Sequence, residues 1–169
     1  MSTTANLGIT LLEAGLRQPE VRINDALTAL DAQIVLPTSW TPTWTNLSIG
    51  NGTVVAKYGR SGKWIVCRLS IVLGSTTLIS GSVSFTLPAT RAAYGGSAGV
   101  TPLGTCYLFD TSALIVLQGT ITNASPTTGL IAVWKADGTY SQSALLSSTV
   151  PFTWATGDEI GMQFLYEAA

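Results

Sequence analysis

Few residues of this chain are of a type that carries out catalysis or binds metal. The 169-residue sequence contains no histidine, which excludes Ser-His-Asp and Cys-His nucleophiles as well as histidine metal sites. Its two cysteines, Cys67 and Cys106, are far apart in the sequence and form neither a zinc motif nor a disulfide framework. We expect buried free thiols in strands, with a single bridge as the alternative.

The acidic residues of the β-rich part do not suggest a catalytic pair. From residue 40 onward the acids are Asp110, Asp137, Asp158, Glu159 and Glu167. A glycosidase needs two facing carboxylates, one of them in surroundings that raise its pKa. Asp158 and Glu159 are adjacent in an expected strand, so they point to opposite faces, and they follow a Thr-Gly turn where surface acids are common. We therefore expect no enzymatic activity, no metal and no cofactor.

Aromatic residues in turns are better suited to bind a ligand, because exposed rings can stack on sugars. Trp134 and Tyr140 flank an expected Lys-Ala-Asp-Gly turn, and Tyr94 lies in a Gly-rich loop. These three residues are the candidate glycan contacts. The alternative is that the aromatic residues pack in the core or between subunits, above all Trp64 and Trp154, which lie within or at the end of expected strands.

Short strands separated by turns must position these residues. Alternating apolar residues between turn-forming Gly, Pro and Asn predict strands over residues 52–58, 63–73, 81–88, 105–110 and 113–121. Residues 130–141 are expected to form a strand that runs into the Lys-Ala-Asp-Gly turn, and residues 149–168 to close the chain with an "ATGD" turn before the last strand. In residues 63–73 the odd-numbered positions from Ile65 share one face, and Trp64, Val66 and Arg68 share the other. Eight or so short strands without a second helix predict a mainly β fold, an antiparallel β-sandwich that is jelly-roll-like.

The N-terminal segment has a different pattern. Leu7, Ile9 and Leu11 alternate with small or polar residues, which predicts an extended arm that pairs with a partner. The alternative is a first strand of the same domain. One short α-helix is then expected over residues 18–34, with Pro19 in its first turn.

The apolar residues of the expected helix step by four, three and four, at Ile23, Leu27, Leu30 and Ile34. Two heptads are too short for an isolated coiled coil, so this stripe must pack on the β domain or on the same stripe of two symmetry mates. We favour the symmetry mates because Ile-rich a and d positions favour more than two strands. Prolines after the helix divide the chain into an arm-and-helix segment, 1–36, and a β-sandwich domain, 37–169.

Composition excludes some partners and suggests others. Net charge is −1 and no basic stripe is present, so we expect no nucleic-acid binding. No run approaches the roughly 18 apolar residues of a membrane helix, and the opening "MSTTANLGIT" has no signal-peptide pattern, so we expect neither membrane insertion nor Sec export. Hydrophobic residues nevertheless make up 46% of the chain, which indicates a large core or surface buried against other copies.

Two segments resemble known proteins. "TANLGITLLEAGLRQPEVRINDALTALDAQI" resembles the N-terminal segment of bacteriophage, prophage and gene-transfer-agent particle proteins over about residues 5–34. It departs from their pattern in having Leu-Arg-Gln-Pro where Gln-Ala-Gln-Lys is typical. Residues 40–169, with "WTPTWTN", "GSVSFTLPAT" and "FTWATGDEIGMQFLYEA", are similar to a β-domain at the ends of phage tail fibres and other virion appendages.

The resemblance implies a non-enzymatic virion surface protein, made in the cytoplasm of the host bacterium. It would be a homotrimeric short fibre, spike or capsid decoration. The arm with Leu7, Ile9 and Leu11 would dock on the virion, and the helical stripe would hold the trimer. The implied partners are other copies of the chain, capsid or tail and baseplate proteins, and a host cell-surface polysaccharide. The alternative is a soluble carbohydrate-binding module or lectin, which would not need residues 1–36 for binding.

Overall fold

The computed structural model covers residues 1–169 and describes residues 3–5, 7–11, 19–32, 34–93, 98–135 and 141–169. The elements in this part are α1 (Pro19–Asp31), β1 (Ile34–Ser39), β2 (Trp44–Ser48), β3 (Thr53–Ser61), β4 (Trp64–Val72), β5 (Leu78–Thr86), β6 (Pro102–Asp110), β7 (Ile115–Ser125), β8 (Thr128–Lys135), β9 (Gln142–Leu145) and β10 (Glu159–Glu167). All the pairings among these strands are antiparallel. The predicted mainly β, antiparallel fold is confirmed.

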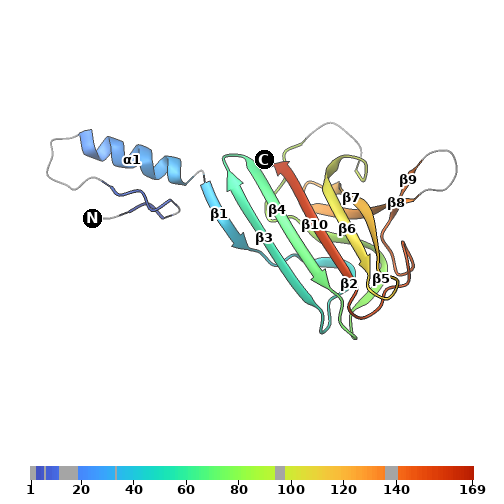
Figure 1. Ribbon diagram of the computed structural model, residues 1–169. Helices are drawn as coiled ribbons and strands as arrows, with labels where there is room; N and C mark the ends of the chain where they lie inside the picture. Colours follow the sequence, from blue (N-terminus) through green and yellow to red (C-terminus); the bar gives the residue numbers. More distant parts are fainter. Residues whose placement is uncertain (1–2, 6, 12–18, 33, 94–97, 136–140) are drawn as a thin grey trace.

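The strands belong to one continuous sheet with the order β1-β3-β4-β10-β6-β7-β8-β5-β2, and β9 pairs with β8. Tight turns join β3 to β4 and β7 to β8, as the Gly-rich "GRSG" predicts for the first of them. The last strand, β10, lies between β4 and β6 (Figure 1). It therefore joins strands that are far apart in the sequence.

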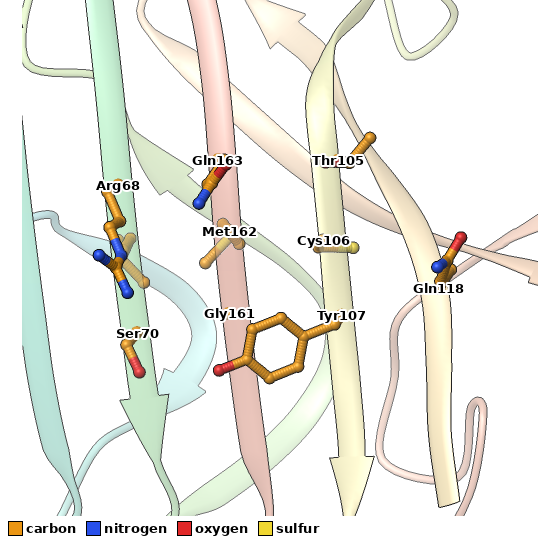
Figure 2. A pocket seen from close by; sticks show the side chains of 10 residues that line it. Arg68, Ser70, Thr105, Cys106, Tyr107, Gln118, Gly161, Met162 and Gln163 are labelled. Atoms are coloured by element: carbon orange, nitrogen blue, oxygen red, sulfur yellow. The ribbon is translucent and has the colours of Figure 1, made fainter.

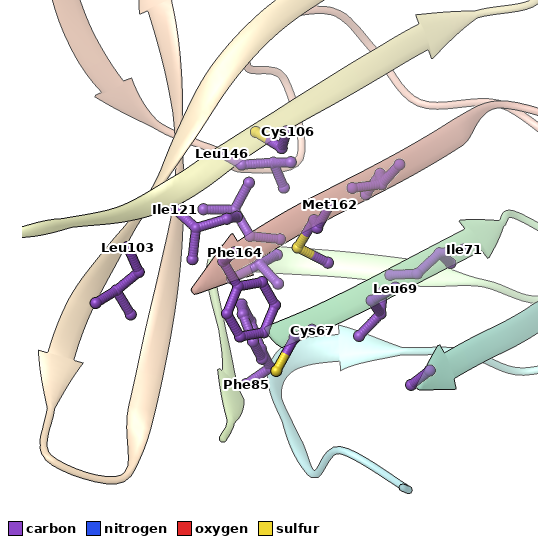
Figure 3. Close-up of a cluster of buried hydrophobic side chains, with 14 of the residues drawn as sticks. Cys67, Leu69, Ile71, Phe85, Leu103, Cys106, Ile121, Leu146, Met162 and Phe164 are labelled. Carbon is purple, nitrogen blue, oxygen red and sulfur yellow. The ribbon is translucent and has the colours of Figure 1, made fainter. Parts of the chain in front are cut away.

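The sheet curls so that its two halves face each other across the core. In the sheet order β5 and β10 are separated by three strands, yet the rings of Phe85 and Phe164 pack with centroids 5.5 Å apart. Trp44 packs on Phe85 at 5.7 Å, and Trp40 meets Phe164 edge-on at 6.4 Å. Figure 3 shows Phe85 and Phe164 among the buried aliphatic side chains. The two layers of this sandwich-like fold thus come from one folded-over sheet, held by apolar burial.

Strand β4 shows how the sequence sets the two faces of the sheet. Its odd-numbered residues from Ile65 to Ile71 are buried in the core, whereas Trp64, Val66 and Arg68 are exposed on the outer face. The predicted alternation is confirmed. Because neighbouring strands are in register, the same alternation defines an outer face that runs across β3, β4, β10 and β6.

The helix is shorter than predicted. It ends at Asp31, and Ile34 instead begins β1, where its backbone pairs with Ser61 of β3. Ile34 opens a run of β-branched and apolar residues that leads to Pro37, and both features favour a strand over a helix. The first strand of the β domain therefore begins before the predicted boundary at residue 37, and α1 lies outside the curled sheet, beyond β1 (Figure 1).

The described part of the N-terminal arm turns back on itself instead of running extended. Thr3 bridges Thr10, and the backbone amide of Thr4 donates to the carbonyl of Ile9 at 2.9 Å. Asp31, at the end of α1, is buried and accepts hydrogen bonds from the Thr4 hydroxyl at 2.8 Å and the Leu7 amide at 2.6 Å. This turn satisfies backbone groups locally, and the carboxylate of Asp31 joins the arm to the helix.

Candidate functional site

The outer face of the sheet carries a shallow groove of about 390 Å³, which we call the outer-face groove. The side chains that define it come from four neighbouring strands: Arg68, Ser70, Thr105, Tyr107, Gln118 and Gln163 (Figure 2). Arg68, Gln163 and Thr105 lie directly across from one another on β4, β10 and β6. The register thus places a guanidinium, an amide and a hydroxyl in one row.

The next row of the groove contains an aromatic ring that covers a glycine. Ser70, Gly161 and Tyr107 are cross-strand neighbours, and Gln118 follows on β7. The ring of Tyr107 extends across β10 toward β4 and is seen face on in Figure 2. A Cβ built on Gly161 would overlap carbons of this ring, so only glycine leaves the ring room to lie against the strand. Tyr107 remains 41% exposed, with its outer side open to a ligand.

Positive charge borders the groove. Lys57 of β3 lies directly opposite Arg68, and both side chains are exposed. Like charges at directly opposed positions of a sheet are destabilising. Within the part of the chain that the structure describes, neither cation makes an ion pair or hydrogen bond. The geometry therefore leaves two adjacent cations available to an anion.

Apolar residues continue the outer face beside the groove. Val66 lies opposite Leu165, Trp64 is two residues before Val66 on the same face, and Val55 is on β3; all four are exposed. A second hollow of about 660 Å³ adjoins Val55 and Val66. This face thus combines a polar groove with an apolar margin.

Of the three predicted glycan contacts, the described residues include only Trp134. Tyr94 and Tyr140 lie outside the described residues. Trp134, at the end of β8, is 53% exposed, as a ligand contact requires. Trp154 packs on the core and donates its indole N–H to the carbonyl of Ser147 at 2.8 Å, which agrees with the packing alternative.

The remaining tryptophans divide between the core and the surface. Trp40 and Trp44 pack against the core cluster. Trp64 is 52% exposed on the outer face, so it is not a core residue. Of the two packing roles predicted for Trp64, in the core or between subunits, only packing between subunits stays a prediction.

The predicted trimer stripe is partly intact. Ile23 and Leu30 are 46% and 56% exposed, and Leu27 is half-buried on the same helix. Ile34 leaves the stripe because it belongs to β1. Of the predicted docking arm, Leu7 is exposed and Ile9 and Leu11 are half-buried.

The cysteines and acids have structural environments. Cys67 and Cys106 are free and buried, as expected, and burial raises the pKa of each thiol to about 12. Asp158 is fully buried, so the expectation of a surface acid is wrong for it. Its carboxylate accepts hydrogen bonds from the amide and hydroxyl of Thr111, both at 3.0 Å, and from the amide of Ala155 at 2.7 Å. In the described residues no cluster of His, Cys, Asp and Glu is suited to hold a metal ion.

Sequence reasoning missed the outer-face groove. Alternation assigns Arg68 to the outer face of its strand, and the same rule puts Thr105 and Tyr107 on one face of theirs. Nothing in the local pattern indicates that β10 lies between these two strands. Gly161 within a strand was the available indication, because such a glycine often marks a close approach.

Comparison with known proteins identified no similar protein. No protein-family model, no curated protein and no solved structure matches this chain. Among the described residues, no helix has the length and apolar character needed to cross a bilayer.

Proposed function

We propose that this chain is a non-enzymatic structural protein of a phage virion surface, a homotrimeric short fibre, spike or decoration. The arm and helix attach it to capsid or tail proteins, and the curled β domain is displayed outward. The observation that carries this proposal is the exposed apolar stripe of α1, which lies outside a β domain that already has its own core.

The spacing and residue types of the stripe are compatible with an assembly of more than two helices. Ile23, Leu27 and Leu30 follow the d, a and d positions of a heptad. Leu at a with Ile at d shifts parallel helices from dimers toward trimers and tetramers. A helix of 13 residues is marginal in water unless an apolar face is covered. Association of three helices would cover Ile23 and Leu30 without unfolding any part of the β domain.

The hydrogen bonds of Asp31 support a joint role for arm and helix. The buried carboxylate fixes the turn around Thr4 and Leu7 against the end of α1. Leu7 stays exposed on this turn. The arm therefore offers an ordered apolar contact to a virion protein at a defined position beside the helix.

The mass of the full-length protein in solution, measured by light scattering, tests the proposal. We expect a mass of about three 17.6 kDa chains. The double change Ile23→Ser with Leu30→Ser should give a single-chain mass and an unchanged β-type circular dichroism spectrum. A matched control on the same helix, Asp25→Ser with Ala29→Ser, alters exposed positions off the stripe and should keep the trimer. A monomeric wild type, or a stripe variant that remains trimeric, would contradict the proposed assembly.

A carbohydrate-binding module is the second candidate, favoured by the exposed Tyr107 ring among polar side chains. It predicts that the stripe variant binds sugar as well as the wild type does. Loss of virion attachment in that variant, measured by co-sedimentation with particles, favours the structural role instead.

A further inference from the structure

We propose that the outer-face groove binds an acidic saccharide, with the Tyr107 ring as the stacking platform and Arg68 with Lys57 as the carboxylate-binding group. This inference rests on the display role proposed above and takes as its ligand the host cell-surface polysaccharide that the sequence resemblance implies. It assigns binding to the side chains of the sheet face rather than to the turn aromatics that the sequence suggested.

The first argument is the shape of the platform. The Tyr107 ring lies along the sheet because Gly161 has no side chain beneath it. A flat, half-exposed ring can stack on the C–H face of a sugar, and its position across β10 holds it in one orientation. A pyranose on this ring would have Gln118 on one side and Ser70 on the other.

The second argument is unused hydrogen-bonding capacity. Within the described part of the chain, none of the six groove side chains donates or accepts a side-chain hydrogen bond. Those on β4, β10 and β6 supply guanidinium, amide and hydroxyl groups within two strand spacings, roughly 10 Å, and Gln118 of β7 adds a second amide one spacing further. That span matches one or two sugar rings, whose hydroxyls need both donors and acceptors.

The third argument is charge. Arg68 and Lys57 are opposed on neighbouring strands with no acidic partner in the described residues, and the other groove side chains are uncharged. A guanidinium binds a carboxylate through two parallel hydrogen bonds, and the second cation adds attraction. A uronic or sialic acid residue would satisfy both cations and still reach the ring. A second copy of this chain is a less suitable occupant, because contact between two such faces would bring Arg68 and Lys57 of both chains together, and like charges repel.

The test is binding of the full-length protein to immobilised oligogalacturonate, hyaluronan oligosaccharides and oligosialic acid, each paired with its methyl ester. We expect at least one acidic form to bind about tenfold more tightly than its ester, because a hydrogen bond to a charged carboxylate is stronger than one to a neutral ester. Arg68→Gln should remove that preference. Tyr107→Ala should lower affinity tenfold or more, and Gly161→Ala should do the same by displacing the ring while the phenol remains.

Leu78→Ala is the control, because it removes an exposed apolar side chain at the start of β5, outside the groove, and should leave binding unchanged. Failure of all three acidic glycans to bind, or equal binding of acids and esters, would overturn the proposal. So would a Tyr107→Ala variant that binds normally, or one that loses the trimer, since that would make this face a contact between copies.

The mass measurement on the same samples separates the two proposals. A trimer that binds no acidic glycan refutes the groove and leaves the virion role standing. A monomer that binds through Tyr107 and Arg68 refutes the trimeric fibre and leaves the groove standing.

Discussion

Asp158 and Glu159 are neighbours in sequence with opposite structural roles, so their amide variants form a sharp test of the fold. Asp158 is fully buried, whereas Glu159 is only partly buried on the other face of β10. The carboxylate of Asp158 joins the β6–β7 turn at Thr111 to the turn before β10 at Ala155. Its own carbonyl accepts from the amide of Leu73, just after β4.

The size of the effect follows from the hydrogen bonds lost. In Asp158→Asn the remaining oxygen still accepts from Thr111, but an amide N–H₂ replaces the oxygen that accepts from Ala155. A hydrogen bond to a charged group contributes about 1.5–3 kcal/mol, and a buried donor left without a partner costs about 1–3 kcal/mol. We expect Asp158→Asn to lower the free energy of unfolding by about 3 kcal/mol. Asp158→Ala, which loses all three bonds, should lower it by about 5 kcal/mol.

Urea unfolding, followed by tryptophan fluorescence at a fixed protein concentration, measures this difference. Glu159→Gln is the control and should change the free energy of unfolding by less than about 0.5 kcal/mol. Equal stabilities for Asp158→Asn and Glu159→Gln would refute the reasoning, because they would mean that the buried carboxylate does not hold the two turns. The slope of the unfolding curve should stay constant, so that the shift reports stability alone.

Two further predictions concern titratable groups. Burial raises the pKa of Cys67 and Cys106 to about 12, so a thiol reagent at pH 8 should react with either cysteine only as fast as the protein opens. Rapid labelling of the native protein would contradict this prediction. The Ser112 hydroxyl, with the amides of Ala113 and Ser112, lowers the pKa of the Asp110 carboxyl below its usual 3.8. Because the folded-state pKa is the lower one, Asp110 stabilises the fold above the unfolded-state pKa and loses that effect as pH falls through the folded pKa. Asp110→Asn should therefore lower the thermal midpoint at pH 6 more than at pH 3, and an equal decrease at both would exclude the effect.

Local pattern predicted the parts of this molecule that depend on nearby residues. The alternation from Trp64 to Ile71 fixed both faces of β4, and the spacing of Ile23, Leu27 and Leu30 indicated α1. The pattern failed at junctions. The apolar step that extended the helix to Ile34 is equally compatible with a strand, and pairing of β1 with β3 decided between them.

The buried acid and the groove needed the tertiary structure. Asp158 follows a turn, where acids are commonly solvated, and only the approach of Thr111 from another hairpin gives its carboxylate partners. Tyr107 and Arg68 are ordinary strand residues until β10 is placed between them.

The sequence by itself determined a mainly β antiparallel fold, an amphipathic N-terminal helix and the absence of histidine chemistry. These features follow from the spacing of apolar residues, from turn-forming residues and from composition, which are local or additive properties of the chain. The tertiary structure decided which strands are neighbours. Strand order depends on contacts between residues distant in the chain, such as Phe85 with Phe164, and no local pattern encodes them. The groove with its opposed cations, and the curl that separates it from the core, exist only because of that order.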